Sequence, residues 1–212
     1  MEQNLSIAII GTGDLASTLG AAWARAGERV SVFGRSPDRA AAVAAGIGAR
    51  TAAAEEIAGH DLVVLAVAPE GVRNALALVG APEGALTGVP LVDTTNAVDW
   101  GTGRHLLDDG SFAEQVAAWA PGAAVVKALQ SYAGRTWLDD PDARRTVPVC
   151  GDDPAALDVV GRAVGALGGR SLVVGGLAAA RQAEEATAFI ARIAAAGGNP
   201  REAVPDVPGR AA

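Results

Sequence analysis

The chain has 212 residues, half of them hydrophobic, and a formal net charge of −7 at pH 7. This length is enough to bury one substantial core, whereas a negative charge without Lys or Arg runs argues against nucleic-acid binding. The longest apolar runs, such as LVVLAVA, are far shorter than the roughly 20 residues of a membrane span, so no membrane partner is expected. No secretory signal pattern is visible and Cys150 has no second cysteine to pair with, which together predict a cytoplasmic location.

Short apolar runs alternate with alanine-rich stretches along the chain. This alternation is typical of βαβ units, in which parallel strands are covered by helices on both faces. The predicted strands are Ser6–Ile10, Val30–Phe33, Asp61–Val67, Pro90–Thr94, Ala124–Lys127, Thr146–Cys150 and Ser171–Val174. The pattern therefore predicts an α/β fold built on a doubly wound parallel sheet.

Three predicted helices carry recognisable signals or bounds. The first, over residues 14–26, is expected to stop at Gly27, which suits the left-handed position after a helix. A second begins at Asp153, whose carboxylate can cap free amides, with Pro154 fitting the first turn. The last helix is predicted over residues 177–195.

A G-x-G-x-x-A motif lies directly between the first predicted strand and the first helix. Gly11 permits a tight turn, Gly13 lets the backbone approach a pyrophosphate, and Ala16 lets the helix pack close to the strand. The helix N-terminus adds unpaired N–H groups and a partial positive charge. A glycine-rich turn can also serve packing alone, but this strand-turn-helix context favours dinucleotide binding. The residues expected to contact the cofactor are Gly11, Thr12, Gly13, Asp14, Leu15 and Ala16.

The end of the second predicted strand distinguishes between two dinucleotides. An Asp or Glu about 20 residues after the first glycines would bind the adenosine ribose of NAD. This chain has Gly34, Arg35 and Ser36 instead, with Arg39 on the first turn of the next helix. A guanidinium forms charge-assisted bonds with a 2′-phosphate, so the sequence favours NADP(H). The alternative is that both arginines are solvated surface charges.

Two further strand ends lie where a parallel sheet exposes its ligand crevice. At the end of the third predicted strand are three residues without a reactive group: Ala66, Val67 and Ala68. They either pack against the cofactor or are simply part of the core and the turn. The next predicted strand is followed by Asn96, which can orient a nicotinamide amide or a substrate. Asn96 can equally cap the turn.

Several stretches together resemble the F420-dependent NADP oxidoreductase family, whose members pass hydride between NADP(H) and the 5-deazaflavin coenzyme F420. The fold of this family also occurs in the reductase domain of membrane ferric reductases. The matching stretches are IIGTGDLA, GRS, DTTNAV, PGAAVVKALQS, VPVCGDDPAAL and VVGGLAAAR, in the family's order and spacing. The resemblance implies a Rossmann-type fold with a small C-terminal α/β extension, NADP(H) as cofactor, coenzyme F420 or a flavin as co-substrate, and a homodimer.

On this basis we expect three parts of the chain. Residues 1–127 form the NADP-binding domain, residues 128–196 form a small domain for substrate binding or dimerisation, and residues 197–212 form a flexible tail. The boundary between the first two is placed in the loop after Lys127.

The sequence departs from the family pattern where the substrate is expected. Ala97 replaces a proline, and Leu129, Gln130 and Ser131 replace Phe, Asn and Thr. The substrate-facing candidates are Asn96, Gln130, Ser131 and Tyr132; no catalytic residue is assigned. Tyr132, the only tyrosine, could protonate a reduced C=C, C=N or C=O bond, whereas a deazaflavin acceptor needs no such acid.

Three functions remain open at this stage. The first is hydride transfer between NADP(H) and a deazaflavin or flavin acceptor, a small molecule. The second is a tailoring reductase that acts on a C=C, C=N or C=O bond of a specialised metabolite. The third is a non-catalytic NADPH sensor, because a fold alone does not define function.

The remaining chemistry-bearing residues predict no further site. With two histidines and one cysteine, no metal site is expected, and His60 and His105 are predicted to lie in solvent or turns. Cys150 is interpreted as a small buried apolar residue. Three tryptophans either line a pocket for an aromatic ligand or fill an interface: Trp100, Trp119 and Trp137.

Overall fold

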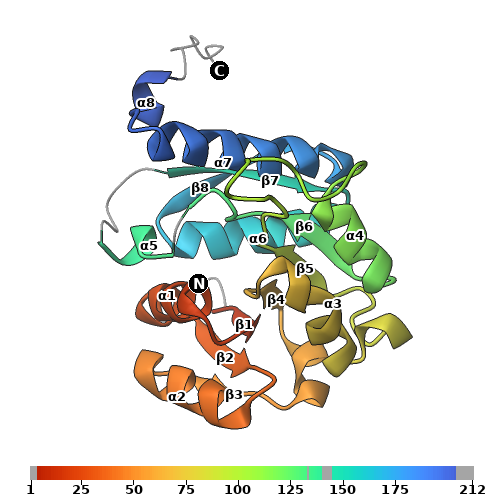
Figure 1. The fold of residues 1–212 in the computed structure, drawn as a ribbon. Coiled ribbons are helices and arrows are strands. Elements are labelled where there is room, and N and C mark those ends of the chain that lie inside the picture. The colour runs from red at the N-terminus through yellow and green to blue at the C-terminus, as the bar shows by residue number, and fades with distance from the viewer. Residues whose placement is uncertain (1–3, 133, 140–144, 204–212) are drawn as a thin grey trace.

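The computed structural model describes residues 4–132, 134–139 and 145–203, and within them eight strands form one sheet (Figure 1). The strand order is β3-β2-β1-β4-β5-β6-β7-β8, and every neighbouring pair is parallel except β6 with β7. The strands are β1 Ser6–Ile10, β2 Arg29–Phe33, β3 Arg50–Thr51, β4 Leu62–Leu65, β5 Pro90–Asp93, β6 Ala124–Lys127, β7 Arg145–Gly151 and β8 Gly169–Gly175. The predicted doubly wound α/β fold is confirmed.

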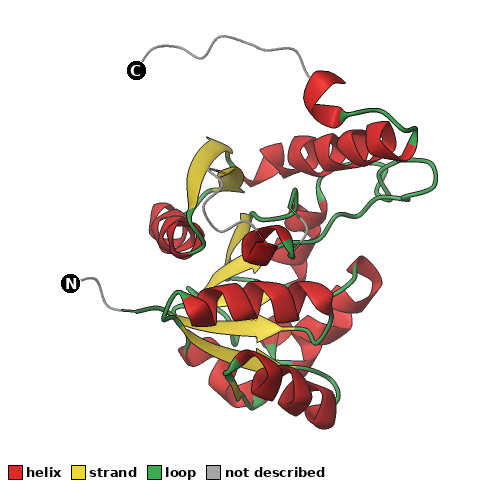
Figure 2. Cartoon of the chain, turned by 90° about the vertical axis from the view of Figure 1, so that its left-hand side faces the viewer, coloured by secondary structure: helices red, strands yellow, loops and turns green. Residues whose placement is uncertain are grey.

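Helices connect the strands. The α-helices are α1 Asp14–Arg25, α2 Pro37–Ile47, α3 Pro69–Leu78, α4 Phe112–Trp119, α5 Thr136–Asp139, α6 Pro154–Ala166, α7 Ala180–Ala195 and α8 Pro200–Ala203. Short 3-10 helices are η1 Ala54–Gly59, η2 Ala81–Glu83 and η3 Leu177–Ala179. Helices α7 and α8 lie at the opposite end of the molecule from α2 (Figures 1 and 2). Among the described residues, no helix combines the length and the apolar composition that a membrane crossing requires.

The local signals at helix ends act as expected. Gly27 follows α1 with φ 91°, in the left-handed region. The Asp153 carboxylate accepts a hydrogen bond from the N–H of Ala156 at 2.9 Å, and Pro154 occupies the first turn of α6. One boundary differs, because the last predicted helix begins as η3 and becomes α-helical only at Ala180.

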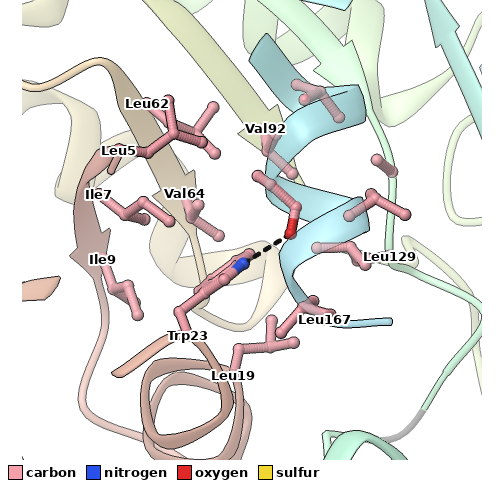
Figure 3. Close-up of a cluster of buried hydrophobic side chains, with 14 of the residues drawn as sticks. Leu5, Ile7, Ile9, Leu19, Trp23, Leu62, Val64, Val92, Leu129 and Leu167 are labelled. Atoms are coloured by element: carbon pink, nitrogen blue, oxygen red, sulfur yellow. Dashed lines mark hydrogen bonds between the residues drawn. The ribbon is translucent and has the colours of Figure 1, made fainter. Parts of the chain in front are cut away.

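Side chains of β1 alternate between two cores, one on each face of the sheet. Ile7 and Ile9 face a cluster covered by α1 and α6, whereas Ala8 and Ile10 face a cluster covered by α3 and α4. In the first cluster, Trp23 of α1 donates its indole N–H to the carbonyl of Ala163 in α6 at 2.8 Å (Figure 3). Parts of the chain on both sides of residue 127 therefore share one core.

The predicted boundary after Lys127 falls between β6 and β7, where the sheet continues through an antiparallel pair. This pair differs in direction from the rest of the sheet, which is the change expected of a C-terminal extension added to a parallel sheet. The division into domains stays a prediction.

Candidate cofactor and substrate site

The turn between β1 and α1 lies where the strand order changes direction, between β1 and β4. Gly11 has φ 145°, and a Cβ there would lie 2.1 Å from the backbone oxygen of Ala66, so only glycine fits. A Cβ at Gly13 would meet no atom within 4 Å. Gly13 is also the N-cap of α1 and provides no side chain to cap its amides. No side chain caps the first amides of α1, and such uncapped amides at a helix N-terminus can bind a phosphate.

A cleft of about 390 Å³ opens beside this turn, at the ends of β1, β2 and β4. We call it the β2 cleft. It is lined by Ile10, Gly11, Thr12, Phe33, Gly34, Arg35, Val67, Glu70, Gly71, Asn74, Ala75 and Leu78. A Cβ at Gly34 would lie 2.5 Å from Cγ2 of Thr12, so this glycine lets the ends of β1 and β2 approach closely. Glu70 contributes a carboxylate from α3 rather than from the end of β2.

Arg35 and Arg39 are exposed, and neither forms an ion pair with another residue in the described part of the chain. Arg35 lines the β2 cleft, whereas Arg39 and Ser36 do not. The Ser36 hydroxyl accepts a hydrogen bond from the Arg39 N–H at 3.5 Å and caps α2. Of these three predicted residues, Arg35 has a guanidinium that is both unpaired and inside the cleft.

The other predicted cofactor residues surround the same turn. Ala16 is a buried residue of α1, and Ala66 is buried with its backbone next to Gly11. Ala68 is exposed as the N-cap of α3. These residues shape the backbone around the turn, and whether they touch a cofactor stays a prediction.

A second cleft, of about 580 Å³, lies on the other side of the turn, against α7. We call it the α7 cleft. It is lined by Asp14, Leu15, Thr94, Asn96, Trp100, Leu129, Gln130, Ser131, Tyr132, Gly134, Thr187, Ile190, Ala191 and Ala194. The structure thus brings all four substrate-facing candidates into one cavity.

Two amide side chains in the α7 cleft have unusual surroundings. The Asn96 Nδ2 donates to the backbone carbonyl of Gln130 at 2.8 Å, and Gln130 is only 6% exposed. Within the described residues, four buried side-chain atoms have no hydrogen-bond partner: Asn96 Oδ1, Gln130 Oε1, Gln130 Nε2 and Trp137 Nε1. Leaving such a group unsatisfied costs about 1–3 kcal/mol. Three of these four atoms belong to Asn96 and Gln130, which line the α7 cleft.

The backbone beside Gln130 is also strained. Leu129 is 2% exposed and has φ 65°, the only described residue other than glycine with a positive φ. A branched residue rarely adopts this conformation, and strain of this kind concentrates at functional sites.

The hydroxyl groups of Ser131 and Tyr132 already have partners. The Ser131 hydroxyl lies 3.1 Å from that of Thr187 in α7. The Tyr132 hydroxyl donates to the backbone carbonyl of Thr146 in β7 at 2.9 Å, and its ring packs edge-on against Trp137. Tyr132 therefore lines the cleft, but its phenol proton is used in a hydrogen bond to the backbone.

A buried ionic cluster contacts the segments that line the α7 cleft. Sequence reasoning missed this cluster. Lys127, the only lysine of the chain, has a fully buried side chain that pairs with Asp93 at 2.9 Å and Glu184 at 2.8 Å. It also donates to the carbonyl of Thr95. Glu184 in turn pairs with His105 Nε2 at 2.5 Å. The cluster joins the ends of β5 and β6, the His105 loop and α7.

The charge state of Glu184 follows from these contacts. Burial alone would raise the pKa of its carboxyl, but the Lys127 ammonium and hydrogen bonds from His105, Lys127 and the Phe112 N–H hold the pKa below its usual value. Glu184 is therefore ionised at neutral pH. Its position could have been found from spacing, because Ala180, Glu184 and Ala188 recur every four residues on the buried side of α7.

The side chains of both histidines are buried, so solvent exposure was a wrong expectation, whereas their positions outside regular helices and strands agree with the prediction of turns. The side chain of His105 is 2% exposed against Glu184, and His60 is 7% exposed with Nε2 2.9 Å from the Ser31 hydroxyl. Cys150 is fully buried, as interpreted, and burial raises the pKa of its thiol. Among the described residues, no group of three or more His, Cys, Asp or Glu side chains is arranged to hold a metal ion.

The three tryptophans occupy different places. Trp100 is 58% exposed at the rim of the α7 cleft, Trp119 packs edge-on against Phe112, and Trp137 is buried beside Tyr132. Trp100 alone is positioned to meet a ligand in that cleft.

The glycine turn, the sheet order and the cleft at the end of β2 define a dinucleotide-binding protein of the Rossmann type. A family model described as coenzyme F420-dependent NADP oxidoreductase matches residues 6–97. Over these residues the chain is similar to the coenzyme F420-dependent NADP oxidoreductase family.

Three individual proteins are similar to this chain. Metalloreductase STEAP3 from Rattus norvegicus is 30% identical over 179 residues, which cover 84% of this chain but 35% of that protein. This chain thus spans about a third of the curated relative. A structure from Arthrobacter sp. FB24, assigned as an F420-dependent NADP reductase, is 28% identical with a TM-score of 0.79, covering 93% of this chain and 96% of that one. A reductive aminase from Aspergillus terreus in complex with NADPH shares the fold, at 15% identity, a TM-score of 0.67, and coverage of 92% and 63%.

Proposed function

We propose that the chain transfers hydride between NADP(H) and a flat, flavin-type acceptor, with coenzyme F420 as the first candidate. The observation that carries the cofactor part is Arg35, which lines the β2 cleft and forms no ion pair with any described residue, at the strand end where NAD-binding proteins carry a carboxylate. A 2′-phosphate at this point forms charge-assisted hydrogen bonds with Arg35.

The two clefts suit the two ends of one dinucleotide. The β2 cleft would hold the adenosine end, the uncapped amides after Gly13 would hold the pyrophosphate, and the α7 cleft, which Asp14 and Leu15 help to line, would hold the nicotinamide. NADPH, when bound, would supply the hydride, and NADP⁺ would accept it in the reverse direction. The residues of the chain bind and orient the cofactor and exclude water from the reacting ring.

The α7 cleft suits an acceptor that needs no protein acid. Trp100 and Ile190 give it an apolar rim, and Tyr132 donates its proton to the Thr146 carbonyl rather than into the cleft. A carbonyl or imine substrate calls for a nearby proton donor, whereas a hydride can reach an electron-poor flavin-type ring without one. The engaged phenol therefore favours the flavin-type acceptor.

The test is a screen of NADPH oxidation at 340 nm against coenzyme F420, riboflavin-type flavins, a ferric chelate, enones and imines. We expect turnover with F420 or a flavin. Turnover of an enone or imine alone would contradict a flavin-type acceptor and would support the alternative function, a tailoring reductase. NADPH binding without turnover of any acceptor would favour a sensor.

We also propose that the chain forms a homodimer through the outer surface of β8 and α7. The edge strand β8 and helix α7 carry apolar side chains that are 44–60% exposed: Leu172, Val173, Val174 and Phe189. Exposed apolar patches of this kind mark interaction sites. Light scattering after size-exclusion chromatography should give twice the mass of 21.1 kDa, and a monomer at micromolar concentration would contradict the proposal.

A further inference from the structure

A short hairpin, residues 98–105, carries Trp100 to the rim of the α7 cleft, and we call it the Trp100 hairpin. An antiparallel bridge between its first and last residues closes it. At its tip, the Asp99 carboxylate accepts hydrogen bonds from the N–H groups of Gly101 and Thr102, at 2.8 and 3.2 Å. The bonds from Thr102 and Gly101 hold the pKa of Asp99 below its usual value. The backbone on both sides of Trp100 is therefore fixed at neutral pH.

The Trp100 hairpin is also held against α7 at two points. At its base, Nε2 of the buried His105 lies 2.5 Å from the Glu184 carboxylate. Near its tip, Gly103 has φ 69°, and a Cβ there would lie 2.2 Å from Cδ of Arg192. Glycine at this position thus lets the Arg192 side chain pack against the turn. Since α7 lines the cleft as well, the hairpin and α7 form two connected walls of one cavity.

The side chain that the hairpin presents at the rim is large and mainly apolar. Trp100 is 58% exposed, and Ile190 of α7, which lines the same cleft, is 41% exposed. The cleft volume of about 580 Å³ is typical of small-molecule sites. An aromatic side chain can bury about 150–250 Å² against a partner, so a ligand that covers Trp100 gains hydrophobic stabilisation.

The shape and charge distribution of an indole favour one class of ligand. The face of the ring is negative and the indole prefers offset stacking on another flat ring. An electron-poor fused ring, as in flavins and deazaflavins, offers such a face. A compact enone or imine with tetrahedral carbons beside its double bond covers only part of the indole. The rim of the α7 cleft therefore favours a fused planar acceptor.

We infer that the Trp100 indole stacks on the fused ring of the hydride acceptor and thereby determines which class of acceptor binds. This inference rests on the proposed function. Because the Trp100 hairpin is ordered before the acceptor arrives, stacking loses little conformational entropy. Trp100 contacts the acceptor and takes no part in the transfer of the hydride, so it is a specificity-determining residue.

The test measures the binding of two flat probes, riboflavin and 5-deazariboflavin, to protein saturated with NADP⁺. Neither oxidised probe can react with NADP⁺, so calorimetry gives dissociation constants independent of turnover. The variants are Trp100→Ala and Trp100→Phe. The matched control is Leu106→Ala, which removes a side chain that is 59% exposed, next to the hairpin but outside the lining of the α7 cleft.

We expect Trp100→Ala to bind both probes roughly tenfold more weakly, because a stacked aromatic pair and its buried area are lost. Trp100→Phe keeps a ring and should recover most of the affinity. Leu106→Ala should bind the probes as the unmutated protein does, and all three variants should bind NADP⁺ unchanged. In steady-state assays, Trp100→Ala should raise the KM for a reducible flavin and leave kcat and the KM for NADPH unchanged.

Three results would overturn the inference. Unchanged probe binding by Trp100→Ala would remove Trp100 from the acceptor site, and equal weakening in Trp100→Ala and Leu106→Ala would reflect a loosened hairpin. A smaller mass of Trp100→Ala in light scattering would assign the exposed indole to a contact between copies of the chain. Failure of the proposed function looks different, because the unmutated protein itself would then neither bind nor reduce either probe, and the inference would fall with it.

Discussion

The β2 cleft and the α7 cleft flank the same glycine turn but are assembled differently. The β2 cleft is built from residues 10–78, with its turn glycines and Arg35 at fixed distances along the chain. The α7 cleft combines four separate segments between residues 14 and 194 and is supported by buried charges. A site made by a local motif tolerates changes elsewhere, whereas a site made by tertiary packing depends on the groups that connect its segments.

The sharpest test of this difference is Lys127→Met. The change leaves Asp93 and Glu184 buried without their shared cation, so we expect a loss of roughly 3–5 kcal/mol in the free energy of unfolding. Urea unfolding followed by circular dichroism measures it. A loss below about 1 kcal/mol would show that the buried charges do not support this half of the molecule.

The corresponding change on the side of the β2 cleft is Gly11→Ala. Its methyl group would collide with the Ala66 carbonyl at a φ that alanine rarely adopts, and we expect a loss of about 3 kcal/mol. Gly13→Ala is the matched control. It meets no protein atom, so it should leave the unfolding free energy within about 1 kcal/mol and weaken NADPH binding. Equal losses of stability in both variants would contradict the different roles assigned to the glycines.

Glu184→Gln tests the ionic cluster through pH. The change removes charge-assisted bonds and should cost roughly 1.5–3 kcal/mol at pH 7. Because the pKa of Glu184 is lowered on folding, its contribution is complete above the unfolded value of about 4.3 and is lost as the pH falls through the folded pKa. The stability difference between the variant and the unmutated protein should therefore shrink on acidification. A stability difference that is constant with pH would contradict a stabilising role of the ionised Glu184 carboxylate.

Arg35→Ala tests the β2 cleft without disturbing the α7 cleft. We expect NADPH to bind about tenfold to a hundredfold more weakly while NADH binding stays nearly unchanged, because only the contact with the 2′-phosphate is lost. Fluorescence titration measures both ligands. Arg25→Ala removes an exposed arginine of α1 outside both clefts and serves as the control. Equal weakening of NADPH and NADH would rule out recognition of the phosphate.

Tyr132→Phe has the smallest expected effect. It removes the hydrogen bond to the Thr146 carbonyl and should cost about 1 kcal/mol of stability. Hydride transfer to F420 should stay within a few fold, since no side-chain acid is required. A fall in kcat of roughly 10²–10⁴ would instead assign the phenol a role as general acid.

The strand pattern and the glycine motif were sufficient to predict the fold and the β2 cleft, because both depend on short-range periodicity. Strand β3 was not predicted because it has only two residues, Arg50 and Thr51, and both are exposed. A segment this short shows no alternation of apolar and polar residues. Ser36 was placed at the right strand end, but its use as the cap of α2 depends on backbone geometry that the sequence does not reveal.

The α7 cleft was only partly predictable. Gln130 was found because it departs from the family pattern, whereas the lack of partners for its amide depends on packing. Lys127 and Glu184 are 57 residues apart and meet only because α7 packs beside the end of β6. The single lysine of the chain, at the end of an apolar strand, was the one available signal for this cluster.

The most direct measurement is a crystal structure of the protein with NADP⁺. The account predicts one dinucleotide across both clefts, with its 2′-phosphate at hydrogen-bonding distance from the Arg35 guanidinium and its nicotinamide in the α7 cleft. A cofactor whose 2′-phosphate faces solvent, or whose nicotinamide lies outside the α7 cleft, would contradict it.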